Sequence, residues 1–172
     1  MTAFEIKTLG GIDSWALIPA DPMGTTVRRL GSNRICVRNH FAFRPGLEVS
    51  PADLRKSRHL HQRSFDRRFP MLKDVSLEYT WGGALCLSAN SGALFGKTDD
   101  DVYQALGCNG LGLSRGSASG KVIAEYALGM SSDMVHQLLN QPQPRPLPMR
   151  PIADLAVSTA IWFKERSAGV EL

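Results

Sequence analysis

One glycine-rich stretch, residues 102–121, combines a short apolar run, a turn and a helical pattern, and it carries the strongest chemical signal in the sequence. Glycine lets the backbone approach a ligand closely, because no Cβ stands in the way. A helix that begins there leaves N–H groups without partners and a partial positive charge at its start. The stretch therefore predicts a site for a phosphate or another electron-rich oxygen.

The glycines of this stretch also recur with helical spacing. Gly112, Gly116 and Gly120 lie four residues apart, so one face of the predicted helix is nearly bare. A flat ligand or a neighbouring strand can pack on such a face, and the spacing leaves both open. The dinucleotide fingerprint is a poorer match, because it requires a second strand with an acidic residue about 20 residues further on. The residues that follow here indicate a helix and a proline-rich arm instead.

Other side chains with possible chemistry are scattered along the chain. His40 lies on the polar face of a predicted strand, where it either lines a substrate pocket or faces solvent. His59 and His61 would point to different sides of a helix, which does not favour a metal pair. Cys108, inside the glycine turn, is either a small space-filling residue or a reactive thiol. The three cysteines lack the spacing of a zinc site, so we predict no metal.

Alternating segments predict the strands that would position these residues. Residues 25–44 indicate a β-hairpin with its turn at residues 31–33 and a second strand over residues 34–44. Their period of two favours an antiparallel sheet with one buried side. Residues 75–81 alternate as clearly and predict a strand that ends at Trp81, which is either a core residue or a wall of a ligand pocket. Shorter strands are predicted at residues 15–19, 93–96 and 102–106.

Helix signals complete a predicted α+β fold. Ser50 is expected to cap a helix over residues 51–68, which Pro70 ends. A loop opening into a helix is predicted over residues 110–128, and further helices over residues 130–140 and 152–167. An extended proline-rich arm, residues 142–151, separates the last two. The last helix offers apolar side chains for docking, namely Leu155, Ala156, Ile161, Trp162 and Phe163.

Composition indicates a globular protein with a core: 43% of the 172 residues are hydrophobic and 21% are charged. The longest nearly apolar run, residues 152–163, is too short to span a bilayer, and the first ten residues show no secretory pattern. We therefore expect a cytoplasmic protein. The net charge is +4, and the Arg-rich segment at residues 28–68 is typical of a solvated sheet face and helix, with a nucleic-acid surface as the less favoured alternative.

Several motifs after residue 80 resemble one enzyme family. They are Trp81-Gly-Gly83, Ser88-Ala-Asn90, Phe95-Gly96, Val102-Tyr103, Gly107-Cys-Asn-Gly-Leu-Gly112 and Gly116-x-x-x-Gly120. Together they are similar to the C-terminal half of the FAD-dependent amine and amino-acid oxidoreductases, the glycine oxidase and D-amino-acid oxidase superfamily. The branch that contains γ-glutamylputrescine oxidoreductase is the nearest in appearance. Weaker likeness extends over most of the chain.

The resemblance implies a two-domain flavoprotein that uses FAD. Residues 1–83 would form part of a substrate-binding domain, mainly an antiparallel sheet with one helix. Residues 84–128 would supply the C-terminal strands and helix of the FAD-binding domain, and residues 129–172 a helix, the proline-rich arm and a terminal helix. The turn would place N–H groups and a helix start near the flavin pyrimidine carbonyls, where they stabilise the charge of the reduced ring. Its implied cofactor-binding residues are Asn109, Gly110, Leu111, Gly112, Leu113 and Ser114, with Trp81 and His40 as substrate-pocket candidates.

The implied reaction is hydride transfer from a C–H bond beside nitrogen to flavin N5, which gives an imine that then hydrolyses. No catalytic residue is indicated. Leu85 stands where relatives often place an arginine that holds the substrate carboxylate. Its presence favours an amine substrate, or an amino acid that another residue anchors.

The family grips the FAD pyrophosphate with a Gly-x-Gly-x-x-Gly turn, and Gly10-Gly11 is not that motif. We therefore expect the chain to be the second half of such an enzyme, from a truncated gene or a split subunit, and to bind FAD poorly alone. A missing N-terminal FAD-binding half or self-association would cover its apolar faces. The alternative is a non-catalytic partner or regulatory module of the same fold. Neither nucleic acid nor a membrane is an expected partner.

Overall fold

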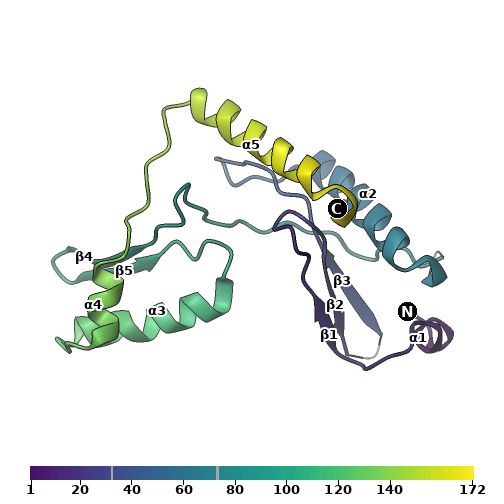
Figure 1. The fold of residues 1–172 in the computed structure, drawn as a ribbon, viewed down its shortest axis with the longest axis horizontal. Helices are drawn as coiled ribbons and strands as arrows, with labels where there is room; N and C mark the ends of the chain where they lie inside the picture. The colour runs from purple at the N-terminus through teal and green to yellow at the C-terminus, as the bar shows by residue number, and fades with distance from the viewer. Residues whose placement is uncertain (32, 73) are drawn as a thin grey trace. The chain divides into compact units, whose positions relative to one another are not determined.

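The computed structural model of the chain describes residues 1–31, 33–72 and 74–172 (Figure 1). Two compact units share these residues: unit 1 comprises Met1–Gly82 and Arg150–Leu172, and unit 2 comprises Gly83–Met149. The fold is α+β, with small antiparallel sheets and five α-helices in the described part of the chain. In chain order the elements are α1 (Ala3–Leu9), β1 (Trp15–Leu17), β2 (Thr26–Leu30), β3 (Arg34–Arg38), α2 (Pro51–Arg68), the 3-10 turn η1 (Pro70–Leu72), β4 (Leu94–Asp99), β5 (Val102–Leu106), α3 (Gly112–Ala127), α4 (Asp133–Leu139), α5 (Ile152–Ala168) and the 3-10 turn η2 (Gly169–Glu171).

Unit 1 is built on the antiparallel sheet β1-β2-β3. Val27 of β2 pairs with Val37 of β3 and is 1% exposed. It packs in a core with Phe65, Phe69 and Leu72, which α2 and η1 supply. The hairpin and the short strand at Trp15 are confirmed, while Ser32 of the predicted turn lies outside the described residues.

The second hairpin strand is shorter than predicted, because β3 ends at Arg38 rather than residue 44. Asn39 turns its carboxamide into the protein, where Nδ2 donates to Thr25 Oγ1 at 3.0 Å and to Ser64 Oγ at 2.8 Å. His40 then adopts a φ of 62°, which is incompatible with a strand. A buried polar anchor therefore overrides the alternating pattern.

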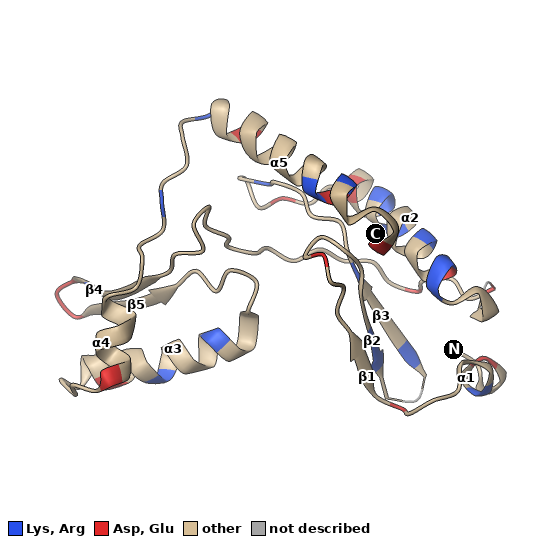
Figure 2. Cartoon of the chain, in the orientation of Figure 1, with Lys and Arg blue, Asp and Glu red and all other residues tan. Residues whose placement is uncertain are grey.

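The helix α2 begins and ends where the sequence predicts. Ser50 caps it through a capping box with Asp53, and Pro51 occupies the first turn. Phe65 buries its ring against Phe69 with a centroid distance of 5.2 Å. The opposite side of the helix is solvated and basic (Figure 2), with Arg55, Lys56, Arg63 and Arg67 exposed.

Arg29 departs from the solvated sheet face predicted for the basic segment. It is 1% exposed, and its Nη1 donates to the carbonyl oxygens of Gly10 at 2.6 Å and Ile12 at 3.0 Å. Backbone carbonyls of the segment that follows α1 thus satisfy a buried guanidinium. The helix α1 itself was not predicted, although Thr2 and Glu5 form a capping box at its start.

The strand predicted over residues 75–81 is wrong: this segment has no strand partner among the described residues. Side chains of α2 take the place of a neighbouring strand. Gln62 Oε1 accepts from Leu77 N at 2.9 Å, and Gln62 Nε2 donates to the Val75 carbonyl at 2.9 Å. Arg58 donates to the Leu77 carbonyl. Alternation specifies two faces, but it does not specify whether a neighbouring backbone edge is present.

Unit 2 consists of the β4-β5 hairpin with α3 and α4. Phe95 of β4, Val122 of α3 and Val135 of α4 form its core. Both predicted strands are present and pair with one another, and residues 100–101 form the exposed turn between them. The helix predicted over residues 130–140 is shorter, since Ser132 caps α4 through its bond from Val135 N.

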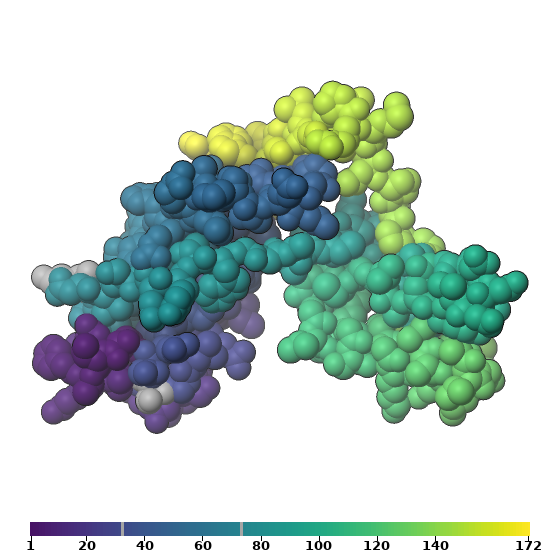
Figure 3. Space-filling model, turned by 180° about the vertical axis from the view of Figure 1, so that it is seen from behind, coloured from purple at the N-terminus to yellow at the C-terminus, as the bar shows by residue number. Residues whose placement is uncertain are grey.

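The terminal helix α5 is present as predicted, and the segment after it closes unit 1. Thr25 N donates to the Glu171 carbonyl at 2.7 Å, and Asp21 N donates to Glu171 Oε2 at 2.9 Å. Glu165 of α5 accepts from Phe41 N at 3.2 Å. In the space-filling view the yellow C-terminal segment lies against the blue residues of the same unit (Figure 3).

Candidate functional site

The turn between β5 and α3 has a backbone that few residue types tolerate. Four of its residues have positive φ: Gly107 at 85°, Asn109 at 48°, Gly110 at 83° and Gly112 at 41°. Glycine and asparagine are the residues that adopt this left-handed region readily. The sequence Gly-Cys-Asn-Gly-Leu-Gly therefore encodes this particular path into the helix.

The start of α3 is not closed by side chains of the described residues. Leu111 occupies the N-cap position and offers no side-chain hydrogen bond, and no acidic residue lies in the first turn. The Ser114 hydroxyl donates to the Leu111 carbonyl at 2.9 Å, so it does not accept from the helix N–H groups there. N–H groups of the first turn are thus available to an external acceptor, and the helix dipole favours one with negative charge.

The glycine face of α3 is open. A Cβ added at Gly112, Gly116 or Gly120 would meet no atom of the described residues within 4 Å. Leu111 is 63% exposed and Leu113 is 89% exposed. The sequence left open either a neighbouring strand or a flat ligand on this face, and no described residue lies within 4 Å of a Cβ placed there. This bare surface lies beside the unpaired N–H donors of the first turn.

Asn109 differs from the other predicted cofactor-binding residues, because its side chain is engaged within unit 2. Its Nδ2 donates to the carbonyls of Ser91 at 3.2 Å, Gly92 at 3.0 Å and Gly107 at 3.0 Å. Its Oδ1 accepts from Ser88 N at 2.8 Å. Asn109 could therefore contact a cofactor through its backbone and not through its carboxamide.

His40, predicted for the substrate pocket, is half-buried in unit 1, and its Nδ1 lies 2.8 Å from Ser57 Oγ. Ser57 donates its hydroxyl hydrogen to the Asp53 carbonyl at 3.0 Å. Burial lowers the pKa of His40, and the Glu165 carboxylate opposes this shift. Burial thus favours the neutral form of the imidazole.

His61, on α2, is also half-buried in unit 1. Its Nε2 lies 3.2 Å from the Asn39 carbonyl, and burial lowers its pKa as well. Trp81, the other substrate-pocket candidate, is 67% exposed in an irregular segment of unit 1. Residues 109–114 belong to unit 2, whereas Trp81 and His40 belong to unit 1.

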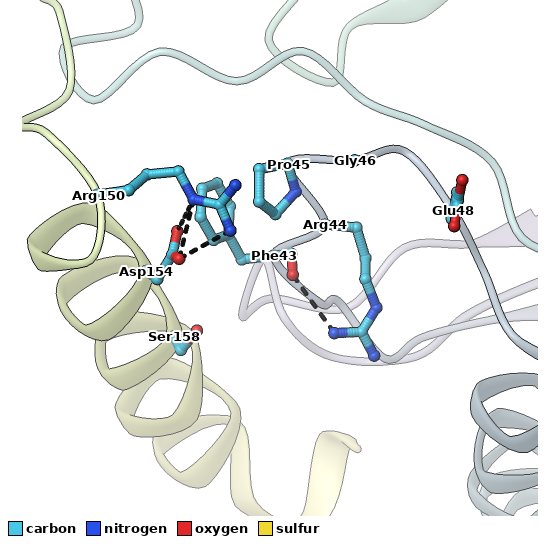
Figure 4. Close-up of a pocket in the computed structure, with 8 residues that line it drawn as sticks. All are labelled: Phe43, Arg44, Pro45, Gly46, Glu48, Arg150, Asp154 and Ser158. Atoms are coloured by element: carbon cyan, nitrogen blue, oxygen red, sulfur yellow. Dashed lines mark hydrogen bonds and ion pairs between the residues drawn. The ribbon is translucent and has the colours of Figure 1, made fainter.

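A depression of about 390 Å³ in unit 1 was not predicted from the sequence (Figure 4). Both arginines that line it form ion pairs with aspartates. Arg150 lies over Asp154, with Nη2–Oδ2 at 2.9 Å, and Arg44 lies 2.5 Å from the carboxylate of Asp53. These pairs are four and nine residues apart in sequence, whereas the depression itself joins residues 43–48 to residues 150–158, which no local pattern reveals. The depression is lined by Phe43, Arg44, Pro45, Gly46, Glu48, Arg150, Asp154 and Ser158.

No group of three or more His, Cys, Asp or Glu side chains in residues 1–31, 33–72 and 74–172 is arranged to hold a metal ion. None of the helices described in those ranges has the length and apolar character needed to cross a bilayer.

Comparison with known proteins gives three matches. Residues 4–126 match the family model DAO, described as FAD dependent oxidoreductase. Probable oxidoreductase OrdL of Haemophilus influenzae is 34% identical over 61 residues, which are 36% of this chain and 14% of that protein. Gamma-glutamylputrescine oxidoreductase of Escherichia coli is 33% identical over 63 residues, 37% of this chain and 15% of that protein. No solved structure matches.

The matched part of this chain thus corresponds to about one seventh of each curated relative. The family model, in contrast, covers well over half of the chain and includes both the sheet of unit 1 and the turn before α3. The cofactor of this family is FAD. The chain belongs to the DAO family of FAD-dependent oxidoreductases.

Proposed function

We propose that this chain supplies the flavin-facing turn and part of the substrate domain of an FAD-dependent oxidoreductase that oxidises a C–N bond of an amine or amino acid. The observation that carries the proposal is the open start of α3, which follows four residues of left-handed backbone. The names of the relatives support it, since both are oxidoreductases and one is named for an amine, γ-glutamylputrescine.

FAD, when bound, would accept the hydride that leaves the substrate carbon. The contribution of this chain is electrostatic and steric. N–H groups in the first turn of α3 would donate to an electron-rich carbonyl of the ring, and the helix start would stabilise negative charge there. Leu111 and Leu113, both largely exposed, would exclude water from that edge.

The substrate-side proposal is an amine, or an amino acid that is not held at residue 85. Leu85 is 52% exposed and offers no charge to a carboxylate. We keep Trp81 and His40 as proposed wall residues of the substrate pocket. His40, whose pKa burial lowers and whose Nδ1 lies beside Ser57 Oγ, would contribute shape and a ring nitrogen.

We also propose that further polypeptide, either an N-terminal FAD-binding half or a second copy, covers the apolar surface of unit 2. Leu113 at 89%, Leu128 at 78% and Leu106 at 59% exposure support this. Light scattering of the purified chain should therefore show association. A stable monomer that binds no apolar dye would contradict this part of the proposal.

The cofactor assignment is tested by titrating FAD to millimolar concentration into the ¹⁵N-labelled chain. We expect shifts at the amides of residues 110–115, and Gly112→Val should weaken the apparent affinity at least tenfold. Gly129→Val is the matched control, because Gly129 also has positive φ and open space but lies at the other end of α3. Arg115→Ala should have little effect, since its Nη2 contacts Gln141 Oε1 at 3.2 Å.

The assignment fails if these amides do not respond to FAD, or if Gly112→Val responds like the parent. An equal loss in the Gly112→Val and Gly129→Val variants, with a lower melting temperature in both, would assign the effect to backbone strain.

A further inference from the structure

The loop of residues 88–92 in unit 2 is held from both sides by asparagine side chains. Asn109 reaches it from the turn before α3. Asn90, inside the loop, reaches the proline-rich arm, where its Nδ2 donates to the Gln143 carbonyl at 2.8 Å. The function proposed above uses neither carboxamide.

The carboxamide of Asn109 is engaged by this loop and by its own turn. Its two N–H donors serve the carbonyls of Ser91, Gly92 and Gly107 at 3.0–3.2 Å. Its oxygen accepts from Ser88 N at 2.8 Å and lies 3.2 Å from Ser88 Oγ. A carboxamide offers two N–H donors, and both are used within unit 2, so no donor of this side chain is left for a ligand.

The same residue adopts the left-handed backbone that directs the chain into α3. Asn109 has a φ of 48°, and Gly107 and Gly110 on either side have 85° and 83°. Two glycines alone would leave this turn with many accessible conformations. The five contacts of Asn109 select one of them, because they fix the residue to a loop that is itself anchored.

The arm supports the loop from behind through backbone atoms. Asn90 Oδ1 accepts from Arg145 N at 3.1 Å, and Ala93 N donates to the Pro142 carbonyl at 3.2 Å. A Cβ at Gly92 would lie 2.6 Å from the Pro142 and Gln143 carbonyl oxygens, so loop and arm pack with no side chain between them. The loop therefore cannot move toward the arm.

We propose that Asn109 is a positioning residue: its side chain clamps the turn to the 88–92 loop and so fixes the direction in which the first N–H groups of α3 point. This inference rests on the proposed function for its flavin side, and on the hydrogen bonds of unit 2 for its structural side. Asn90 extends the clamp to the arm, which makes the arm part of the support of the turn.

Three variants isolate the clamp. Asn109→Gly keeps the left-handed backbone accessible and removes all side-chain contacts. Asn109→Asp keeps the size but turns a carboxylate oxygen toward carbonyl oxygens. Asn140→Ala is the control, because Asn140 is an exposed residue of unit 2 whose side chain has no hydrogen bond with the described residues.

Hydrogen–deuterium exchange of the full chain, without cofactor, measures the clamp. In Asn109→Gly we expect amides of residues 88–92 and 107–114 to exchange at least tenfold faster, and faster still in Asn109→Asp. Peptides from α2 and the Asn140→Ala variant should match the parent. Parent-like exchange in Asn109→Gly would overturn the proposal.

Titration with FAD as the probe then measures the flavin side. We expect Asn109→Gly to raise the apparent Kd at least tenfold and to reduce the amide shifts of residues 112–115, while its far-UV circular dichroism stays at the parent value. A parent-like titration would overturn the positioning role, even if exchange is faster. If the parent and Gly112→Val both fail to respond to FAD, the proposed function fails, and the exchange experiment still decides whether Asn109 clamps the turn.

Discussion

The helices α2 and α3 begin in opposite ways. The start of α2 is closed by its own side chains: Asp53 N donates to Ser50 Oγ at 3.1 Å, and Asp53 Oδ2 accepts from Ser50 N at 3.1 Å. Hydrogen bonds from Ser50, helped by Arg44, lower the pKa of Asp53. The start of α3 has Leu111 at the cap position and no acidic residue in its first turn.

This difference separates a structural helix start from one suited to a ligand. A capped helix has satisfied its first N–H groups within the sequence, so it gains nothing from an external acceptor. An uncapped helix leaves the same groups to water or to a ligand. The glycines that precede and follow Leu111 keep the approach to these groups clear.

The largest expected effect is a loss of stability in the core of unit 1, which α2 covers, without a loss in the core of unit 2, which includes α3. Phe65 of α2 is 2% exposed, and Phe65→Ala should destabilise unit 1 by about 3–5 kcal/mol, through lost burial and the cavity left behind. Urea denaturation measures the loss of stability, and hydrogen–deuterium exchange of peptides from α2 and α3 shows which unit it affects. Arg67→Ala, an exposed change on the same helix, should have little effect. Simultaneous loss of protection in α3 would show that the units do not unfold separately.

The next effect tests whether the open start of α3 attracts negative charge from outside. Leu111→Asp places a carboxylate beside the first-turn N–H groups, where it should compete with a flavin carbonyl and weaken FAD affinity about tenfold, or ~1.4 kcal/mol. Leu128→Asp adds the same charge at the other end of α3 and should leave the affinity unchanged. Equal affinities for Leu111→Asp and the parent would remove the electrostatic part of the proposal.

A smaller effect tests the caps themselves. Ser50→Ala should lower the free energy of unfolding by about 1 kcal/mol, because Asp53 N then loses its acceptor. Ser114→Ala should lower it by no more than a few tenths of that amount, because the Ser114 hydroxyl donates back to the Leu111 carbonyl and does not cap the helix. Urea midpoints of the two variants give the comparison directly. Similar losses would mean that Ser114 does support the start of α3.

The smallest effect is a pH dependence confined to unit 1. Burial lowers the pKa values of His40 and His61 from the ordinary value of 6.5, so the unfolded chain binds protons more readily than the folded one. The free energy of unfolding should therefore be highest above about pH 6.5, and it should decrease as the pH falls through the lowered pKa values of the folded chain. Thermal melts from pH 8 to pH 5 should show a shallower fall for His61→Gln than for the exposed control His59→Gln.

Local signals predicted the parts of the fold that local chemistry specifies. Ser50, Pro51 and Pro70 place both ends of α2, because capping, first-turn geometry and helix termination act within a few residues. The glycine pattern likewise located the turn before α3. The α+β fold could be predicted at this level, whereas the FAD family was predicted from the resemblance of the motifs after residue 80.

Features that depend on distant partners could not be predicted. Residues 75–77 alternate like a strand, yet Gln62 and Arg58 satisfy their backbone groups. His40 looked like a residue of a continuing strand until the buried contacts of Asn39 ended that strand. The occupied carboxamide of Asn109 is of the same kind, since its acceptors lie up to 18 residues away.

The contacts of Glu171 imply that unit 1 completes its folding late. Its contacts with Asp21 and Thr25 join residues about 150 positions apart, whereas Asn90 and Arg145 in unit 2 are 55 apart. Contacts between distant residues form late, because a longer loop must close first, and domains fold as their residues emerge during synthesis. Unit 2 can therefore fold on the ribosome before Glu171 joins the rest of unit 1. A stalled or shortened translation product would then leave unit 1 exposed, although the N-terminal residues of unit 1 are synthesised first.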